Sequence, residues 1–205
     1  MIKIENVEVH GWESAIRGCR NPMNSWGRMD SYQDTTCFRI GPNDHDLMVR
    51  LAKAGSEHAK YRRMIVVWVD VTAPLYWWKE FDTYKVGTVA NSCSTMHKIS
   101  EKEFTLEDFS CEHLYSGTMP TFDNIIHELN CARSRFLSTN DKEDWWQIIQ
   151  LLPSSYNQRR TIMLNYEVLS NIYRQRKNHK LDEWRTFCQW IKTLPYSELI
   201  TLEEE

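Results

Sequence analysis

The sequence predicts an α+β fold, in which a small antiparallel or mixed sheet is flanked by a predominantly helical remainder. Apolar residues alternate with polar ones over residues 2–9, and residues 64–71 form a continuous β-branched run. After Pro120, apolar residues recur mainly at helical spacing. The 205 residues are 41% hydrophobic and 26% charged, which is typical of one globular domain spanning residues 1–205.

Two strands are expected near the N-terminus. The alternation over residues 2–9 slips in phase at Glu5-Asn6, which predicts a strand with a bulge. The run 64–71 predicts a central strand, because it is continuous and rich in β-branched residues, which favour strands.

Helices are expected over most of the rest. Asn43 is a candidate N-cap for a helix that ends at Gly55, and Pro74 can open another. Residues 14–36 are predicted to be mostly loop after a short helix, and the final residues to be frayed. The later helices are expected at about 74–84, after Pro120, at 141–152, at about 156–176 and at about 181–194.

Composition excludes several classes of protein. The net charge of −3 argues against binding to duplex nucleic acid. The longest apolar stretch, 64–69, is far shorter than the ~20 residues of a membrane span. The charged start does not resemble a signal peptide, so a cytoplasmic location is expected. Neither a P-loop nor a G-x-G-x-x-G motif occurs.

The six cysteines are scattered without a Cys-x-x-Cys pair, so free thiols and no metal site are expected. Cys93 and His97 are four residues apart and would share a face of a helix, which suggests a thiolate–imidazole enzyme. The alternative, a polar loop without a shared role for the two residues, is the favoured interpretation.

Two further features have a structural and a functional interpretation. Nine Trp and nine Tyr indicate a large aromatic core or an oligomer interface, or else a stacking site for a planar ligand. The adjacent pairs Trp77-Trp78 and Trp145-Trp146 favour packing, since neighbouring rings on a helix diverge by about 100°. Arg174, Arg176 and Lys177 complement a helix dipole or form an anion site.

Several segments, taken together, resemble one known family. Asn165 and Asn171 precede Arg176 and then Trp184 at that family's spacing, and Leu152-Pro153 stands at the expected interval before Asn165. The other matching segments are His58, the strand 64–71, the stretch 74–85 and, more weakly, 15–19. This pattern is similar to that of the flavin-dependent thymidylate synthases (ThyX, or thymidylate synthase complementing proteins), and it covers most of the chain.

The resemblance implies a ThyX-like fold, FAD as cofactor and a homo-oligomer, commonly a tetramer, whose sites are assembled from several subunits. It also implies a small nucleotide-like substrate, with NADPH and methylenetetrahydrofolate as further reactants if the family reaction is retained. No catalytic side chain is implied, because the flavin carries the chemistry. The implied flavin-binding residues are His58, Tyr84, Lys85, Asn165 and Asn171. The implied substrate-binding residues are Glu80, Lys85, Asn91, Cys93 and Arg176.

The chain departs from the family in its nucleotide-binding arginines. The Arg-His-Arg signature is Thr83-Tyr84-Lys85 here, and two later arginines are Thr95 and Ile149. Losing three charge-assisted hydrogen-bonding groups forfeits about 4–9 kcal/mol, so deoxyuridine monophosphate (dUMP) is expected to bind weakly in the family's mode. Lys85 restores a point charge but not a fork of donors.

Two functions follow from this comparison. One is flavin-dependent one-carbon transfer or reduction on a different pyrimidine-like substrate. The other is a catalytically silent flavin- or nucleotide-binding or assembly protein on the same fold.

Overall fold

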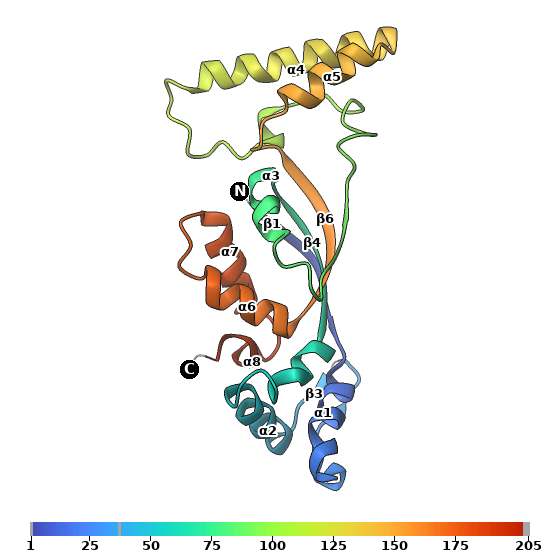
Figure 1. Cartoon of the computed structure of the whole chain (residues 1–205), viewed down its shortest axis with the longest axis vertical. Coiled ribbons are helices and arrows are strands. Elements are labelled where there is room, and N and C mark those ends of the chain that lie inside the picture. The colour runs from blue at the N-terminus through green and yellow to red at the C-terminus, as the bar shows by residue number, and fades with distance from the viewer. Residues whose placement is uncertain (1, 37, 203–205) are drawn as a thin grey trace. The chain divides into compact units, whose positions relative to one another are not determined.

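The computed structural model describes residues 2–36 and 38–202, and it confirms the α+β class (Figure 1). The strands are β1 (Lys3–His10), β2 (Tyr32–Gln33), β3 (Phe38–Arg39), β4 (Val66–Pro74), β5 (Val89–Ser92) and β6 (Asn157–Asn165). The helices are α1 (Trp12–Arg20), α2 (Pro42–Lys53), α3 (Leu75–Phe81), α4 (Met119–Thr139), α5 (Lys142–Leu151), α6 (Tyr166–Arg176), α7 (Asp182–Ile191) and α8 (Glu198–Thr201). Short 3-10 helices are η1 (Asn21–Met23), η2 (Trp26–Arg28), η3 (Ala59–Met64) and η4 (Leu106–Asp108).

Most of the predicted run 64–71 lies in the inner strand β4, which begins at Val66 and extends to Pro74. The four-stranded sheet has the order β1-β4-β6-β5, and β2 and β3 form a separate antiparallel hairpin. Val67, Val69 and Val71 of β4 are buried, as the β-branched run predicts. In β1, Asn6 has a φ of 52°, in the left-handed region, at the position of the predicted phase slip.

The described residues divide into two compact units. The first unit contains the residues up to Ile4 together with 70–83 and 91–161, and the second contains 5–69, 84–90 and 162 onward. That the chain folds as a single domain stays a prediction. Within the described part, no helix combines the length and the apolar character needed to cross a membrane.

Tryptophans pack the core of the first unit. The rings of Trp77 and Trp78 are fully buried and steeply inclined at 74°, with 4.8 Å between centroids. Trp78 Nε1 donates to the backbone oxygen of Gln158 at 2.8 Å. This pair therefore makes packing contacts, as the sequence favoured. A second cluster joins α4 and α5 through Ile99, Phe104, Phe109, Phe122, Leu129, Ala132 and Ile148.

The second unit is built around α6 and α7. Tyr166 and Trp184 are fully buried, and Phe187 packs edge-on against Trp184 at 6.1 Å. The backbone N–H of Tyr166 donates to the oxygen of Ile65 at 3.1 Å, which fixes the start of α6 beside the end of η3.

The expectation of one long helix over 156–176 is wrong in its first half. Residues 157–165 form β6, in which Gln158, Ile162 and Leu164 are buried while Arg159 and Thr161 are exposed. This two-residue burial period belongs to a strand. Basic and polar residues in the segment obscured the period in the sequence.

Two N-terminal expectations also need correction. Asn43 is not the N-cap of α2: Gly41 occupies that position, Pro42 is the first helical residue, and the Asp30 carboxylate accepts from the backbone of Asn43. The strand β2 lies within residues 14–36, which the sequence predicted to be mostly loop, and its partner β3 follows directly after that range. Each strand is two residues long, which is too short to show a hydrophobic period.

A buried ion pair connects α1 and α2 in the second unit. Arg20 donates to Asp44 Oδ1 at 2.6 Å, and the side chains are 4% and 0% exposed. The other carboxylate oxygen accepts from the Ser31 hydroxyl and the Asp30 backbone. Burial by itself raises the pKa of Asp44, but hydrogen bonds from Ser31, Arg20 and Asp30 outweigh burial and lower it below its usual value.

We expect Asp44→Asn to lower the free energy of unfolding by about 3 kcal/mol, because it leaves the Arg20 charge buried and uncompensated. Asp46→Asn, an exposed position on the same helix, is the matched control and should change stability by less than about 0.5 kcal/mol. Since the folded-state pKa of Asp44 is lowered, the stabilisation is present above its ordinary value of 3.8 and is lost as the pH falls. Urea unfolding of both variants at pH 7 and in acid measures this. Equal loss in the two variants would contradict it.

Candidate functional site

A cavity of about 690 Å³ lies beside α6, within the second unit. Its wall combines the end of α2, the turn before η3, one face of α6 and the C-terminal segment. The lining residues are Ala52, Lys53, Gly55, Ser56, Arg62, Glu167, Ser170, Asn171, Tyr173, Arg174, Lys177 and 200–202. We refer to it as the α6 cavity.

Asn165 determines how α6 presents its side chains. It is the N-cap of the helix, and its Oδ1 accepts from the backbone of Glu167 at 3.1 Å and of Val168 at 3.0 Å. Because residues three and four apart share a helix face, Glu167, Asn171 and Arg174 line the cavity together.

Arg62 is the buried charge of the α6 cavity, with 6% of its surface exposed. Its Nη1 donates to the Ser170 hydroxyl at 3.2 Å and to the Leu199 oxygen at 3.1 Å, and its Nη2 lies 2.7 Å from Glu167. Among the described residues, Arg62 Nε has no hydrogen-bond partner. A buried, unsatisfied N–H on a cation favours an anionic or strongly accepting ligand nearby.

The charge of the α6 cavity is positive. The side chains that line it have a net formal charge of +3 at neutral pH. Four are cations, Lys53, Arg62, Arg174 and Lys177, and one is a carboxylate, Glu167. Arg174 donates to Asn171 Oδ1 at 2.8 Å, which orients the Asn171 amide toward this cluster. The arrangement suits a phosphate-bearing ligand. It also favours the anion-site interpretation of the Arg174–Lys177 cluster.

Arg176 belongs to a different face of α6. Its Nε donates to the Tyr84 hydroxyl at 2.9 Å, and Tyr84 in turn donates to Gln175 Oε1 at 2.9 Å. The Arg176 guanidinium lies 4.8 Å from the ring centre of Trp184. The structure therefore brings together Tyr84 and Arg176, which the resemblance placed in one site, and adds Trp184.

The other expected flavin-binding residues are more dispersed. His58 is exposed in the turn that Gly55 begins, and its backbone N–H donates to the Gly55 oxygen at 3.1 Å. Lys85 is exposed in the segment before β5. Gly87, with a φ of +80°, lies so close to Asn165 that a Cβ there would be 3.1 Å from its Nδ2.

The remaining substrate-binding candidates lie in the first unit. Glu80 is half-buried on α3, Asn91 is exposed on β5, and Cys93 is exposed directly after β5. The helix that would pair Cys93 with His97 is absent: residues 93–97 are a loop and a turn. The favoured interpretation of this segment as a polar loop agrees with the structure.

Cys19 and Cys188 of the second unit are poor nucleophiles. Burial raises the pKa of Cys19 and of Cys188 to about 12, so both thiols are protonated at neutral pH. The described residues contain no group of three or more His, Cys, Asp or Glu side chains placed to hold a metal ion.

Sequence reasoning missed Lys53, Arg62, Glu167 and Ser170. Arg62 and Arg63 are adjacent in the sequence, yet the first is buried and the second is exposed. Nothing in the local sequence distinguishes the two, since Arg62 is buried by α6 and α8, which come more than a hundred residues later.

The fold is that of ThyX. One structure with this fold, thymidylate synthase X (ThyX) from Helicobacter pylori with FAD and dUMP, has a TM-score of 0.71 and 15% identity, and the match covers 98% of each chain. A second, the flavin-dependent thymidylate synthase ThyX from the same organism complexed with FAD and dUMP, has a TM-score of 0.69 and 16% identity over 96% of this chain and 98% of that one. No protein-family model and no curated protein matches the sequence.

We expect the α6 cavity to bind inorganic pyrophosphate, with an affinity that falls as salt rises. Arg174→Gln should weaken binding about fivefold, or ~1 kcal/mol, because the lost cation is partly exposed. Arg185→Gln removes an exposed cation of α7 outside the cavity and is the matched control. Calorimetric titration measures both variants, and an equal effect of the two would rule out the α6 cavity as the anion site.

Proposed function

We propose that the chain is a diverged relative of the flavin-dependent thymidylate synthases that binds FAD at the α6 cavity. The proposal rests on the position of Asn171, one of the two asparagines that match the family's spacing. It lines a cavity whose side chains have a net formal charge of +3. The full-length likeness to structures with FAD and dUMP supports it.

The residues of the α6 cavity fit a flavin dinucleotide. Its pyrophosphate would be held by Lys53, Arg174 and Lys177, and the Arg62 N–H without a partner among the described residues would gain one. Asn171 offers an amide donor and acceptor for the flavin or its ribityl chain. Bound there, FAD would supply redox and one-carbon carrier chemistry, which protein side chains lack.

The substrate we propose is a pyrimidine nucleotide-like molecule other than dUMP in the usual mode, and the reaction is one-carbon transfer or reduction. His58, Tyr84, Lys85 and Asn165 would complete the flavin side. The substrate side would comprise Glu80, Lys85, Asn91, Cys93 and Arg176. NADPH and methylenetetrahydrofolate would take part if the family reaction is retained. Since family sites combine several subunits, we propose a homotetramer.

Arg176 has a specific role in this proposal. Stacking on Trp184 and the bond to Tyr84 restrict its guanidinium to one orientation. The family pattern has a His where this chain has Tyr84. A tyrosine hydroxyl that accepts from Arg176 is one way in which this site would recognise a substrate different from dUMP.

The second candidate is a catalytically silent flavin- or nucleotide-binding or assembly protein. The observation that favours it is the replacement of the Arg-His-Arg signature by Thr83-Tyr84-Lys85. Complementation of a thymidine auxotroph or turnover of a pyrimidine nucleotide would exclude it.

We expect the purified chain to give a perturbed flavin absorption spectrum on titration with FAD. Asn171→Ala should weaken FAD binding about 3–10-fold, the range of one or two lost hydrogen bonds. Asn178→Ala, at an exposed position outside the cavity, should leave the titration unchanged. No spectral change at millimolar FAD would overturn the redox proposal and leave the assembly alternative.

We expect dUMP to bind the wild-type chain weakly, and a Thr83→Arg/Thr95→Arg double variant to bind it at least about tenfold more tightly, since each arginine restores a charge-assisted donor. Thr186→Arg, on an exposed position of α7, controls for added charge. Equilibrium dialysis with radiolabelled dUMP gives the affinities. Tight binding by the wild type would contradict the proposed change of substrate.

A further inference from the structure

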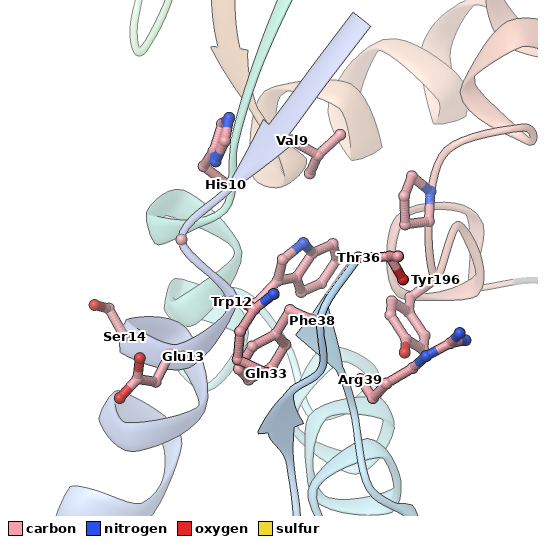
Figure 2. Close-up of a pocket in the computed structure, with 12 residues that line it drawn as sticks. Val9, His10, Trp12, Glu13, Ser14, Gln33, Thr36, Phe38, Arg39 and Tyr196 are labelled. Carbon is pink, nitrogen blue, oxygen red and sulfur yellow. The ribbon is translucent and has the colours of Figure 1, made fainter.

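A second and larger cavity, of about 840 Å³, lies at the junction of β1 and α1 in the same unit (Figure 2). It is lined by the end of β1, the start of α1, the hairpin β2–β3 and the turn before α8. The lining residues are 9–14, Gln33, Thr36, Phe38, Arg39, Pro195 and Tyr196. We refer to it as the hairpin cavity, and it shares no lining residue with the α6 cavity.

Aromatic rings form much of the wall of the hairpin cavity. Trp12 is 7% exposed, and the rings of Tyr166 and Tyr196 meet it at steep angles with centroids 5.3 and 5.2 Å away. Phe38 and Tyr196 are half-buried, so part of each ring is accessible from the cavity. In Figure 2, Trp12, Phe38 and Gln33 are drawn in the centre of the pocket, with Val9 and His10 toward one end of the view and Arg39 toward the other.

The backbone holds this wall in a fixed conformation. Tyr196 has a φ of +52°, which is costly for an aromatic residue, and its hydroxyl accepts from the Ile40 backbone at 2.9 Å. Gly11 has a φ of +100°, and a Cβ there would lie 2.1 Å from the Met64 oxygen, so no other residue fits. The strained turn and the close approach preorganise the cavity, which lowers the cost of binding a rigid ligand.

The ionisable side chains of the hairpin cavity each have an opposite charge nearby. Arg39 Nε lies 2.9 Å from Asp34, Glu13 lies 3.6 Å from Arg17, and His10 lies 3.4 Å from Glu8. The lining of the hairpin cavity therefore offers no excess charge for a ligand to neutralise. The Gln33 amide donates one hydrogen bond to the Asp34 backbone oxygen at 3.0 Å, and the Thr36 hydroxyl donates to Asp34 Oδ1 at 2.9 Å. The second N–H and the oxygen of the Gln33 amide are therefore the polar groups that this wall offers to a ligand.

We propose that the hairpin cavity is a second ligand site, which binds an uncharged planar heteroaromatic ring. The ring packs against Phe38 and Tyr196, with Trp12 as the back wall. Its polar edge meets the Gln33 amide. Aromatic packing favours a flat ring over a saturated one of equal size, and the paired charges favour a neutral ring over an anionic one.

The test uses the full chain and four probes: adenine and indole as neutral heteroaromatic rings, benzoate as an anionic ring and cyclohexanol as a saturated one. Saturation-transfer NMR and calorimetry measure binding in the presence of saturating inorganic pyrophosphate, and again with Arg174→Gln, so that occupation of the α6 cavity is recognised. We expect adenine and indole to bind at least about tenfold more tightly than benzoate or cyclohexanol.

Two variants report on the site, and one is their matched control. Phe38→Leu keeps an apolar side chain without a ring, and Gln33→Ala changes an exposed residue, so both leave the core intact. Each should weaken adenine binding about 3–10-fold. Tyr32→Leu removes a ring from the same hairpin, at a position that is 60% exposed and outside the lining, and should have no effect.

Three outcomes would overturn the proposal. They are the absence of adenine and indole binding up to their solubility limits, equal affinity for cyclohexanol or benzoate, and unchanged adenine affinity in both Phe38→Leu and Gln33→Ala. Loss of adenine binding in Arg174→Gln, or its displacement by inorganic pyrophosphate, would assign the probe to the α6 cavity and would also overturn it.

Discussion

The buried guanidinium of Arg62 is the interaction on which the second unit and its candidate site depend. A charge removed from water costs several kcal/mol unless it is paired and hydrogen-bonded. Ser170, Glu167 and the Leu199 oxygen provide that pairing, and they come from α6 and from the start of α8. Arg62 therefore holds three segments together, and the same three segments form much of the α6 cavity wall.

The α6 cavity and the hairpin cavity differ in the charge of their lining, although the C-terminal segment contributes to both. Pro195 and Tyr196 line the hairpin cavity, and residues 200–202 line the α6 cavity. Between them, Glu198 pairs with His45 of α2 at 2.6 Å. The segment 195–202 thus contributes its first residues to the neutral, aromatic wall of the hairpin cavity and its last residues to the wall of the cationic α6 cavity. A change in the position of α8 would alter both cavities at once.

Short-range sequence patterns correctly predicted the strands and helices that depend mainly on neighbouring residues. The β-branched run 64–71 became β4, and the helices after Pro120 and at 141–152 became α4 and α5. The strand β6 was missed because its buried positions include Gln158, a polar residue. Its burial is tolerated because its amide donates to the Cys93 backbone oxygen and accepts from the Arg160 side chain. For the site, the spacing of Asn165, Asn171 and Arg176 pointed to α6, and Asn171 lines the α6 cavity; that these residues bind a ligand stays a prediction. Arg62 and the hairpin cavity were not predictable, since both arise from residues far apart in the sequence.

The strand order has a consequence for how the chain folds. In the sheet, β1 is next to β4, and β4 is next to β6, although more than fifty and more than eighty residues separate these neighbours along the chain. No adjacent pair among β1, β4 and β6 can form as a local hairpin. Each pairing must close a long loop, and the chain entropy lost in closing it is offset only after the strand contacts have formed. Helices such as α4 and α5 can form early, but β4 gains its second neighbour after β6 has been synthesised. During translation, the edge of β4 that pairs with β6 therefore stays unpaired until β6 has been synthesised. The strand order thus determines how long this apolar edge is exposed to aggregation.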